Sequence, residues 1–214
     1  DLPQYLAATA KAAGVRRLIH ISSFSVYGNA QAIDITTREA PISDYGQSKL
    51  AGDRGLLALS APEFGVMILR LPLIYAVEST TGGFGKLGQL LKLWTRVRWL
   101  PTPAGDVERA MIGVDLAAQI VARLAQSSHP AKTSEILLAA DPMPFTYADL
   151  MRVRPEPLRC RTVPRILAQF AMRVSPALGG RLFADSRLAT SDNLAIRYGF
   201  TSRLYQDIGG AAIR

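Results

Sequence analysis

The stretch Leu18-Ile19-His20-Ile21-Ser22-Ser23, residues 18–23, decides the fold of this chain. It is short, apolar and β-branched, which is typical of a buried strand in a parallel sheet. Residues 3–13, just before it, have small and apolar side chains at helical spacing and are followed by Gly14, so they predict a helix. A second helix is predicted at 43–59 and a second buried strand at 65–71. This order predicts an α/β fold built on a doubly wound parallel sheet.

Beyond residue 75 the predicted elements are separated by loops rich in glycine and proline. We expect strands at 110–114 and 134–139, and helices at 86–95, 115–124, 164–174, 187–198 and 204–213. Another helix is expected to begin at Thr146 and to break at Pro155. The chain therefore divides into residues 1–75 and residues 76–214, with a helix at 115–127 that can pack back on the first sheet.

The composition is that of a globular protein. Of 214 residues, 49% are hydrophobic and 20% are charged, and no apolar run approaches the roughly 20 residues of a membrane-spanning helix. Lys and Arg number 25 against 17 Asp and Glu, a net charge of +8, but they are spread along the chain. A basic enzyme with an anionic substrate is therefore favoured over a nucleic-acid binder, which ranks last among our hypotheses.

The few cysteine and histidine residues narrow the chemistry further. Cys160 is the single cysteine, which excludes an internal disulfide and fits the reducing cytoplasm better than secretion. His20 lies within a predicted strand and His129 in a loop, and neither has a cysteine or carboxylate cluster near it in sequence. We expect no metal site.

A tyrosine and a lysine carry the most specific chemistry. Tyr45 and Lys49 are one turn apart on a predicted helix, and a neighbouring cation stabilises a phenolate, which lets a tyrosine act as a general base. Ser23 ends the first predicted strand, at the sheet edge where ligands bind in such folds. Taken singly, the pair is also compatible with an exposed helix contact, and Ser23 with a serine that bonds local backbone.

Three motifs together resemble a known family. They are Ser-Ser-x-x-Val-Tyr-Gly at 22–28, Tyr-x-x-x-Lys at 45–49 and Leu-Arg-Leu-Pro-Leu-Ile-Tyr at 69–75. The sequence resembles the extended short-chain dehydrogenase/reductases of the NAD-dependent epimerase/dehydratase family, from Asp1 to about Leu124 and more loosely to Arg214. The resemblance implies that residues 1–75 are the C-terminal half of a Rossmann-like, NAD(P)-binding domain. Residues 76–214 would be mainly a smaller, mixed α/β substrate domain.

The resemblance also implies site residues. In the implied Ser-Tyr-Lys triad, Ser23 orients the substrate oxygen, Tyr45 moves the proton, and Lys49 tunes Tyr45 and holds the nicotinamide ribose of NAD or NADP. The backbone wall beside the nicotinamide would be the segment Pro72, Leu73 and Ile74. The nucleotide-sugar substrate would be contacted by Ser23, by Phe84 with its neighbour Gly83, and by Arg109 at the diphosphate.

Departures from the family pattern refine the hypothesis. The family's glycine-rich strand-to-helix turn does not occur in these residues, and the first methionine is Met67, so we expect the first half of the nucleotide fold to lie outside this sequence. Phe24 and Ser25 stand where sugar dehydratases usually have Asp-Glu, which disfavours dehydration. The segment after Arg70 is closer to reductase and sterol-dehydrogenase-like members than to galactose-type epimerases.

We therefore expect an NAD(P)-dependent epimerase or reductase that acts on a nucleotide-activated sugar by hydride transfer. The alternatives are a sterol or 3-beta-hydroxysteroid-type dehydrogenase of the same family, and a catalytically inactive NAD(P)-sensing scaffold. By resemblance we expect a cytoplasmic homodimer that associates through residues 3–13 and 45–59. No nucleic-acid or membrane partner is expected.

Overall fold

The computed structural model describes residues 2–75, 99–103, 107–127, 134–146, 159–174 and 185–201. The helical elements in these ranges are α1 (Leu2–Ala12), η1 (Phe24–Tyr27), α2 (Asp44–Leu57), α4 (Val114–Gln126), α6 (Arg165–Val174), η2 (Thr190–Asp192) and α8 (Leu194–Arg197). The strands are β1 (Arg17–Ser23), β2 (Ala32–Ile33), β3 (Gly65–Leu71), β4 (Leu73–Tyr75), β5 (Trp99–Pro103), β6 (Glu108–Arg109), β7 (Met111–Gly113), β8 (Ser134–Leu138), β9 (Phe145–Thr146), β10 (Arg159–Val163) and β11 (Arg187–Leu188).

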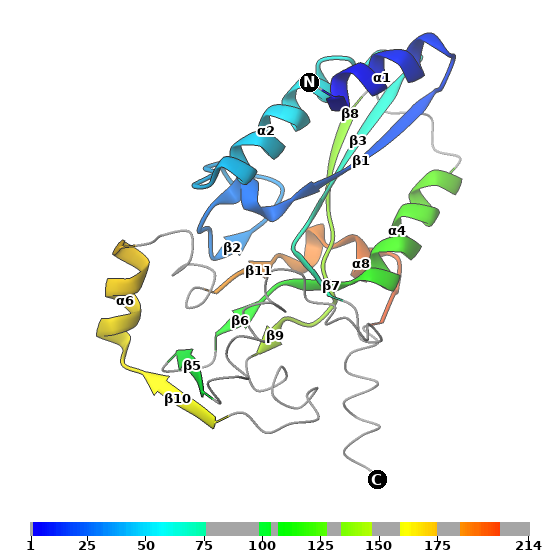
Figure 1. Ribbon diagram of the computed structural model, residues 1–214. Coiled ribbons are helices and arrows are strands. Elements are labelled where there is room, and N and C mark those ends of the chain that lie inside the picture. The colour runs from blue at the N-terminus through cyan, green and yellow to red at the C-terminus, as the bar shows by residue number, and fades with distance from the viewer. Residues whose placement is uncertain are drawn as a thin grey trace.

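A parallel sheet in the order β1-β3-β8 forms the centre of the fold. In register, Ser23 pairs with Leu71 and Arg70 pairs with Leu138, so these strands end at a common carboxyl edge. Helices α1 and α2 cover one face of the sheet and α4 covers the other (Figure 1). This confirms the predicted doubly wound parallel arrangement, in which parallel strands are buried between two helical layers.

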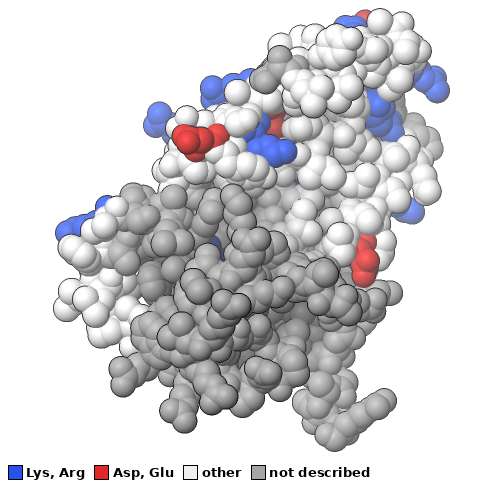
Figure 2. All heavy atoms as spheres, viewed as in Figure 1, with Lys and Arg blue, Asp and Glu red and all other residues white. Residues whose placement is uncertain are grey.

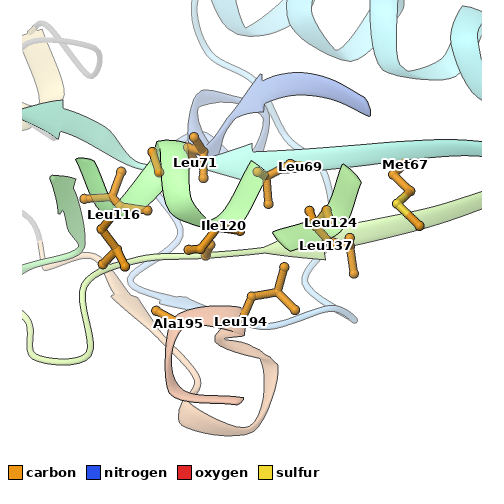
Figure 3. Close-up of a cluster of buried hydrophobic side chains, with 12 residues drawn as sticks. Met67, Leu69, Leu71, Leu116, Ile120, Leu124, Leu137, Leu194 and Ala195 are labelled. Carbon is orange, nitrogen blue, oxygen red and sulfur yellow. The ribbon is translucent and has the colours of Figure 1, made fainter. Parts of the chain in front are cut away.

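Alternation along β3 assigns its side chains to the two layers. Val66 and Ile68 pack against Ala7 of α1 and Leu56 of α2, whereas the odd-numbered residues face α4. Figure 3 shows this second cluster, which joins β3, α4, β8 and α8 through Met67, Leu69, Leu71, Leu116, Ile120, Leu124, Leu137 and Leu194. Each such buried aliphatic side chain stabilises the fold by about 1.5–3 kcal/mol.

Short strands form pairs outside the central sheet. The pairs β4 with β7, β11 with β2, and β10 with β5 are parallel, and β6 with β9 is antiparallel. Because β4 follows β3 after one residue, its pairing with β7 continues the chain from the carboxyl edge of the central sheet into the second part of the fold.

The predicted helix at 187–198 is wrong. Residues 187–188 form β11, which pairs with β2, and residues 190–192 form the single turn η2 before the short helix α8. Asn193 Oδ1 accepts from the backbone N–H groups of Ala195 and Ala140, so it begins α8 and anchors it to the end of β8. A polar cap of this kind competes with a continuous helix, which the spacing of apolar residues did not reveal.

Other predictions fall outside the described ranges. They include the helices at 86–95 and 204–213, and most of the segment from Thr146 to Pro155; Thr146 itself ends β9 rather than beginning a helix. Among the residues that the structure describes, no helix has the length and apolar character needed to cross a membrane.

Candidate active site

The helix that carries Tyr45 and Lys49 begins at the carboxyl edge of the sheet. Ser43 caps α2, its Oγ accepting a hydrogen bond from the Gly46 N–H at 3.2 Å. Asp44 lies in the first turn, where a negative charge is favourable. Residues 45, 49 and 53 are spaced by four and so share one stripe of α2. Since Asp53 is fully buried against the sheet, this stripe faces the sheet at its inner end.

Ser23 is held at the end of β1 by local hydrogen bonds. Its Oγ accepts from the Ser25 N–H at 3.2 Å, which caps the turn η1, and it donates to Ser25 Oγ at 3.2 Å. The side chain is half-buried. The hydroxyl is therefore fixed at the sheet edge and is engaged with its own turn.

A glycine brings α2 against that turn. A Cβ atom on Gly46 would lie 2.5 Å from the carbonyl oxygen of Ser25, a closer approach than real side chains make, and 3.1 Å from Pro41 Cβ. Gly46 therefore allows the first turn of α2 to contact η1 directly. Tyr45, the preceding residue, is 53% exposed.

Lys49 is tied to the same strand. Its Nζ donates to the carbonyl oxygen of Ile21 at 3.1 Å, so the ammonium lies against β1 just before Ser23. In the described part of the chain, no hydrogen bond joins Tyr45 directly to Ser23 or Lys49. The structure thus brings these residues to one edge of the sheet through backbone contacts.

The segment Pro72, Leu73 and Ile74 begins where β3 ends. Because Leu71 pairs with Ser23, this segment leaves the sheet directly beside the end of β1. Leu73 and Ile74 are 43% and 41% exposed, so they present apolar surface at the carboxyl edge. This is the side of a parallel sheet on which ligands bind.

Arg109 and Phe84 are the other two residues expected to contact the substrate, and only the first lies in the described part of the chain. Arg109 is half-buried on β6, where it pairs with Phe145 of β9, in a sheet separate from β1, β3 and β8. Phe84 and Gly83 lie outside the described residues. In the described ranges, no group of His, Cys, Asp and Glu is arranged to hold a metal ion.

A buried polar network, which was not predicted from the sequence, lies behind this edge. Asp53 and Arg70 are 0% and 2% exposed, and Arg70 Nε donates to Asp53 Oδ2 at 3.0 Å. Ser22 Oγ donates to the same oxygen at 2.9 Å. These bonds join α2 to both β1 and β3, immediately below the residues that form the edge.

The other end of the Arg70 guanidinium continues the network. Nη1 donates to Tyr27 OH at 3.0 Å, with the guanidinium carbon 5.1 Å from the centre of that ring, and Nη2 donates to Glu39. Glu39 also accepts from the exposed Arg54 at 3.1 Å. The sequence contained one signal of this network. Arg70 lies within the apolar strand 65–71, and a charge buried there requires a buried partner.

Burial and pairing shift the pKa values of this network. Burial alone lowers the pKa of Arg70, but the hydrogen bonds to Tyr27 and Glu39 outweigh it and raise that pKa. Burial raises the pKa of Tyr27, although Arg70 opposes this. The pKa of Glu39 is raised by burial but lowered more by Arg70 and Arg54, so it falls overall. At neutral pH the guanidinium is therefore charged and the phenol is neutral.

His20 lies at the inner end of the same network. Its Nε2 is 3.8 Å from Asp53 Oδ1, a buried oxygen that accepts no hydrogen bond from the described residues. Burial and the nearby Lys49 lower the pKa of His20, and the attraction of Asp53 only partly offsets them. The imidazole is therefore neutral at physiological pH.

Comparison with known proteins gives a family match and more distant structural matches. The family model described as the NAD dependent epimerase/dehydratase family matches residues 1–135. A UDP-glucose 4-epimerase of Vibrio cholerae is 25% identical over 155 residues, which cover 69% of this chain and 45% of that protein. This chain thus spans less than half the length of that curated relative.

Two solved structures share the fold. MoeE5 in complex with UDP-glucose and NAD is 22% identical with a TM-score of 0.64, and the match covers 97% of this chain and 68% of that one. The dTDP-4-dehydrorhamnose reductase from Bacillus anthracis, in complex with NADP, is 17% identical with a TM-score of 0.66, and covers 99% of this chain and 70% of that one. At these identities the likeness concerns the fold.

Proposed function

The chain belongs to the NAD-dependent epimerase/dehydratase family, and from this premise we propose that the protein is an NAD(P)-dependent epimerase or reductase acting on a nucleotide-activated sugar. One observation carries the proposal. The end of β1 with Ser23, the first turns of α2 with Tyr45 and Lys49, and the apolar segment 72–74 meet at the carboxyl edge of the sheet. The relatives named above, which act on or bind nucleotide sugars, support the substrate class.

The residues at this edge have complementary chemical roles in the proposal. Tyr45 takes the proton of a sugar hydroxyl during oxidation and returns it during reduction. The Lys49 ammonium stabilises the phenolate by its charge. Ser23 exchanges its bond to Ser25 for one to the substrate oxygen, and so aligns the reacting carbon.

The same edge fits the nicotinamide end of NAD or NADP. Leu73 and Ile74 offer an exposed apolar wall for a flat ring, and Lys49 offers a cation that can donate to ribose hydroxyls. Tyr45 and Pro72 would complete this contact. When bound, the cofactor supplies the site that accepts and returns hydride.

The second part of the chain would hold the sugar nucleotide. We assign Arg109 to the diphosphate, because a guanidinium matches phosphate oxygens in charge and geometry. Phe84 would contact the nucleotide. In this proposal residues 1–75 belong to the cofactor domain and 76–214 mainly to the substrate domain, while α4 packs on the cofactor-domain sheet and β8 is one of its strands.

The cellular setting is also part of the proposal. A homodimer would associate through α1 and α2, and the apolar side chains Leu2, Tyr5 and Leu6 that α1 exposes support it. A cytoplasmic location agrees with the single cysteine.

Replacement of Tyr45 by Phe tests the function directly. In the intact protein we expect Tyr45→Phe to lower turnover of UDP-glucose, UDP-galactose or dTDP-4-keto sugars at least about a hundredfold, because the general acid/base is removed. NADH and NADPH affinity, measured by fluorescence, should change little. Tyr198→Phe, which keeps the ring that packs against the core cluster, is the matched control and should leave turnover unchanged.

The remaining outcomes separate the alternatives. Unchanged turnover in Tyr45→Phe would exclude the proposed proton transfer. Turnover of 3-beta-hydroxysteroids without turnover of sugar nucleotides would favour the steroid-type dehydrogenase. Binding of NAD(P) without turnover of either class would favour the sensing scaffold.

A further inference from the structure

Helix α6 exposes an unusually apolar side. Ile166, Leu167, Phe170 and Val174 are 79%, 58%, 64% and 68% exposed, whereas Ala168 is buried. The helix lies at the margin of the molecule, after β10 (Figure 1). Single exposed apolar residues are common, but several large ones gathered on one helix mark a surface that contacts something else.

These apolar side chains form one sector of the helix. At about 100° per residue, positions 166, 167, 170 and 174 fall within about 100° of one another. Gln169 and Arg173, both exposed, border that sector on one side, and Ala168 faces the protein on another. The apolar sector of this amphipathic helix therefore faces solvent, away from the protein core.

The charged residues of this helix and of the strand before it have one sign. Residues 159–174 contain four arginines, at 159, 161, 165 and 173, and no acidic residue. Helix α6 itself contains no acidic residue. In Figure 2 the surface over α6 is white with blue beside it and no red. Such a combination of exposed apolar residues and arginines matches the boundary between the headgroups and acyl chains of an anionic bilayer.

We propose that α6 is an interfacial helix that docks the protein on a membrane surface containing anionic phospholipids. Its apolar sector would enter the headgroup boundary, while Arg173 pairs with lipid phosphates. A second copy of the chain fits this surface less well, because it would bring two arginine-rich segments together. This proposal departs from the expectation of no membrane partner, which was drawn from the sequence.

Vesicle sedimentation with the intact protein tests the proposal. We expect binding to vesicles of phosphatidylcholine with about 30% phosphatidylglycerol at about 0.1 M NaCl, and much weaker binding to phosphatidylcholine alone or at about 0.5 M NaCl. The double variant Ile166→Gln/Phe170→Gln should weaken binding at least about tenfold, because it removes most of the inserting surface. Met143→Gln, at another exposed apolar residue, is the matched control and should bind normally.

Reversing the charge of a single arginine is the second part of the vesicle-binding experiment. Arg173→Glu should weaken binding about tenfold, whereas Arg197→Glu should not, although both are exposed arginines in the last turn of a helix. The proposal would be overturned if the two charge reversals had equal effects, or if the double glutamine variant bound normally. Either result would mean that binding depends only on the net charge of the chain. A lower molecular mass of the double variant in solution, with no vesicle binding by any form, would assign the surface to a second copy instead.

Discussion

Asp53 shows how a single buried carboxylate can hold the candidate site together. It accepts from Arg70 and Ser22, and so ties α2 to two strands that end at the carboxyl edge of the sheet. We expect Asp53→Ala to lower the free energy of unfolding by about 3–5 kcal/mol, because it leaves the Arg70 guanidinium buried without this partner. Urea denaturation measures the loss. Arg54→Ala removes only an exposed ion pair to Glu39, so a cost above about 1 kcal/mol in this control would contradict the argument from burial.

His20 makes stability depend on pH in a defined window. Its pKa in the folded protein lies below the reference value of 6.5, mainly because of burial and then because of Lys49. The unfolded chain therefore takes up a proton that the folded protein disfavours, and the free energy of unfolding falls as the pH drops below about 6.5. In His20→Gln this part of the loss should disappear.

Glu39 separates this effect from acid denaturation. Because its pKa is lowered from 4.5, its contribution is present above that value and is lost only at lower pH. Urea midpoints measured from pH 7.5 down to about 5 therefore isolate the histidine. An identical slope in the unaltered protein and His20→Gln would show that the imidazole does not control stability in this window.

At the scale of elements, the fit between α2 and η1 decides where Tyr45 lies. We expect Gly46→Ala to destabilise the fold by about 1–3 kcal/mol, because its Cβ would meet the Ser25 carbonyl oxygen at 2.5 Å. Turnover should fall as well, since the helix must move away from the end of β1. Gly52→Ala is the control in the same helix, where a Cβ meets nothing within 4 Å.

The glycine control is expected to act in the opposite direction. Alanine is favoured over glycine in a helix interior by up to about 1 kcal/mol, so Gly52→Ala should raise the thermal midpoint while leaving turnover intact. If both alanine variants behave alike, the close approach at Gly46 does not constrain the site.

The central elements could be predicted because their apolar periods are regular. The predicted strand at 65–71 coincides with β3, and the predicted helix at 43–59 corresponds closely to α2. The contact between Asp53 and Arg70 could not be predicted, because it depends on how a helix and a strand that are separate in sequence are aligned with each other. Alternation along β3, known only once Val66 and Ile68 are seen to face α2, explains why Arg70 meets Asp53.

At the scale of the whole molecule, residues in local motifs were easier to identify from the sequence than contacts between distant segments. Ser23, Tyr45 and Lys49 lie in short motifs, so the sequence could name them and the parallel sheet could be expected to gather them at one edge. Arg109 lies on a short strand whose partner, β9, is far away in the chain, and such pairings leave little trace in composition or spacing. Residues 159–174 contain four arginines and no acidic residue in the sequence, but only the exposed apolar side chains of α6 indicate a surface there.

The association of two copies is a prediction about the exposed surface of α1. Helix α1 exposes Leu2, Tyr5 and Leu6 beside α2, an apolar face that water covers unless a second copy buries it. If α1 forms the dimer interface, Leu6→Glu should shift the mass measured by light scattering from dimer to monomer, because a buried unpaired carboxylate costs several kcal/mol. Met143→Glu introduces the same charge at an exposed site outside α1 and should remain dimeric. A monomeric mass of the unaltered protein, or a dimer that persists in Leu6→Glu, would exclude this interface and leave the exposed face of α1 without its proposed partner.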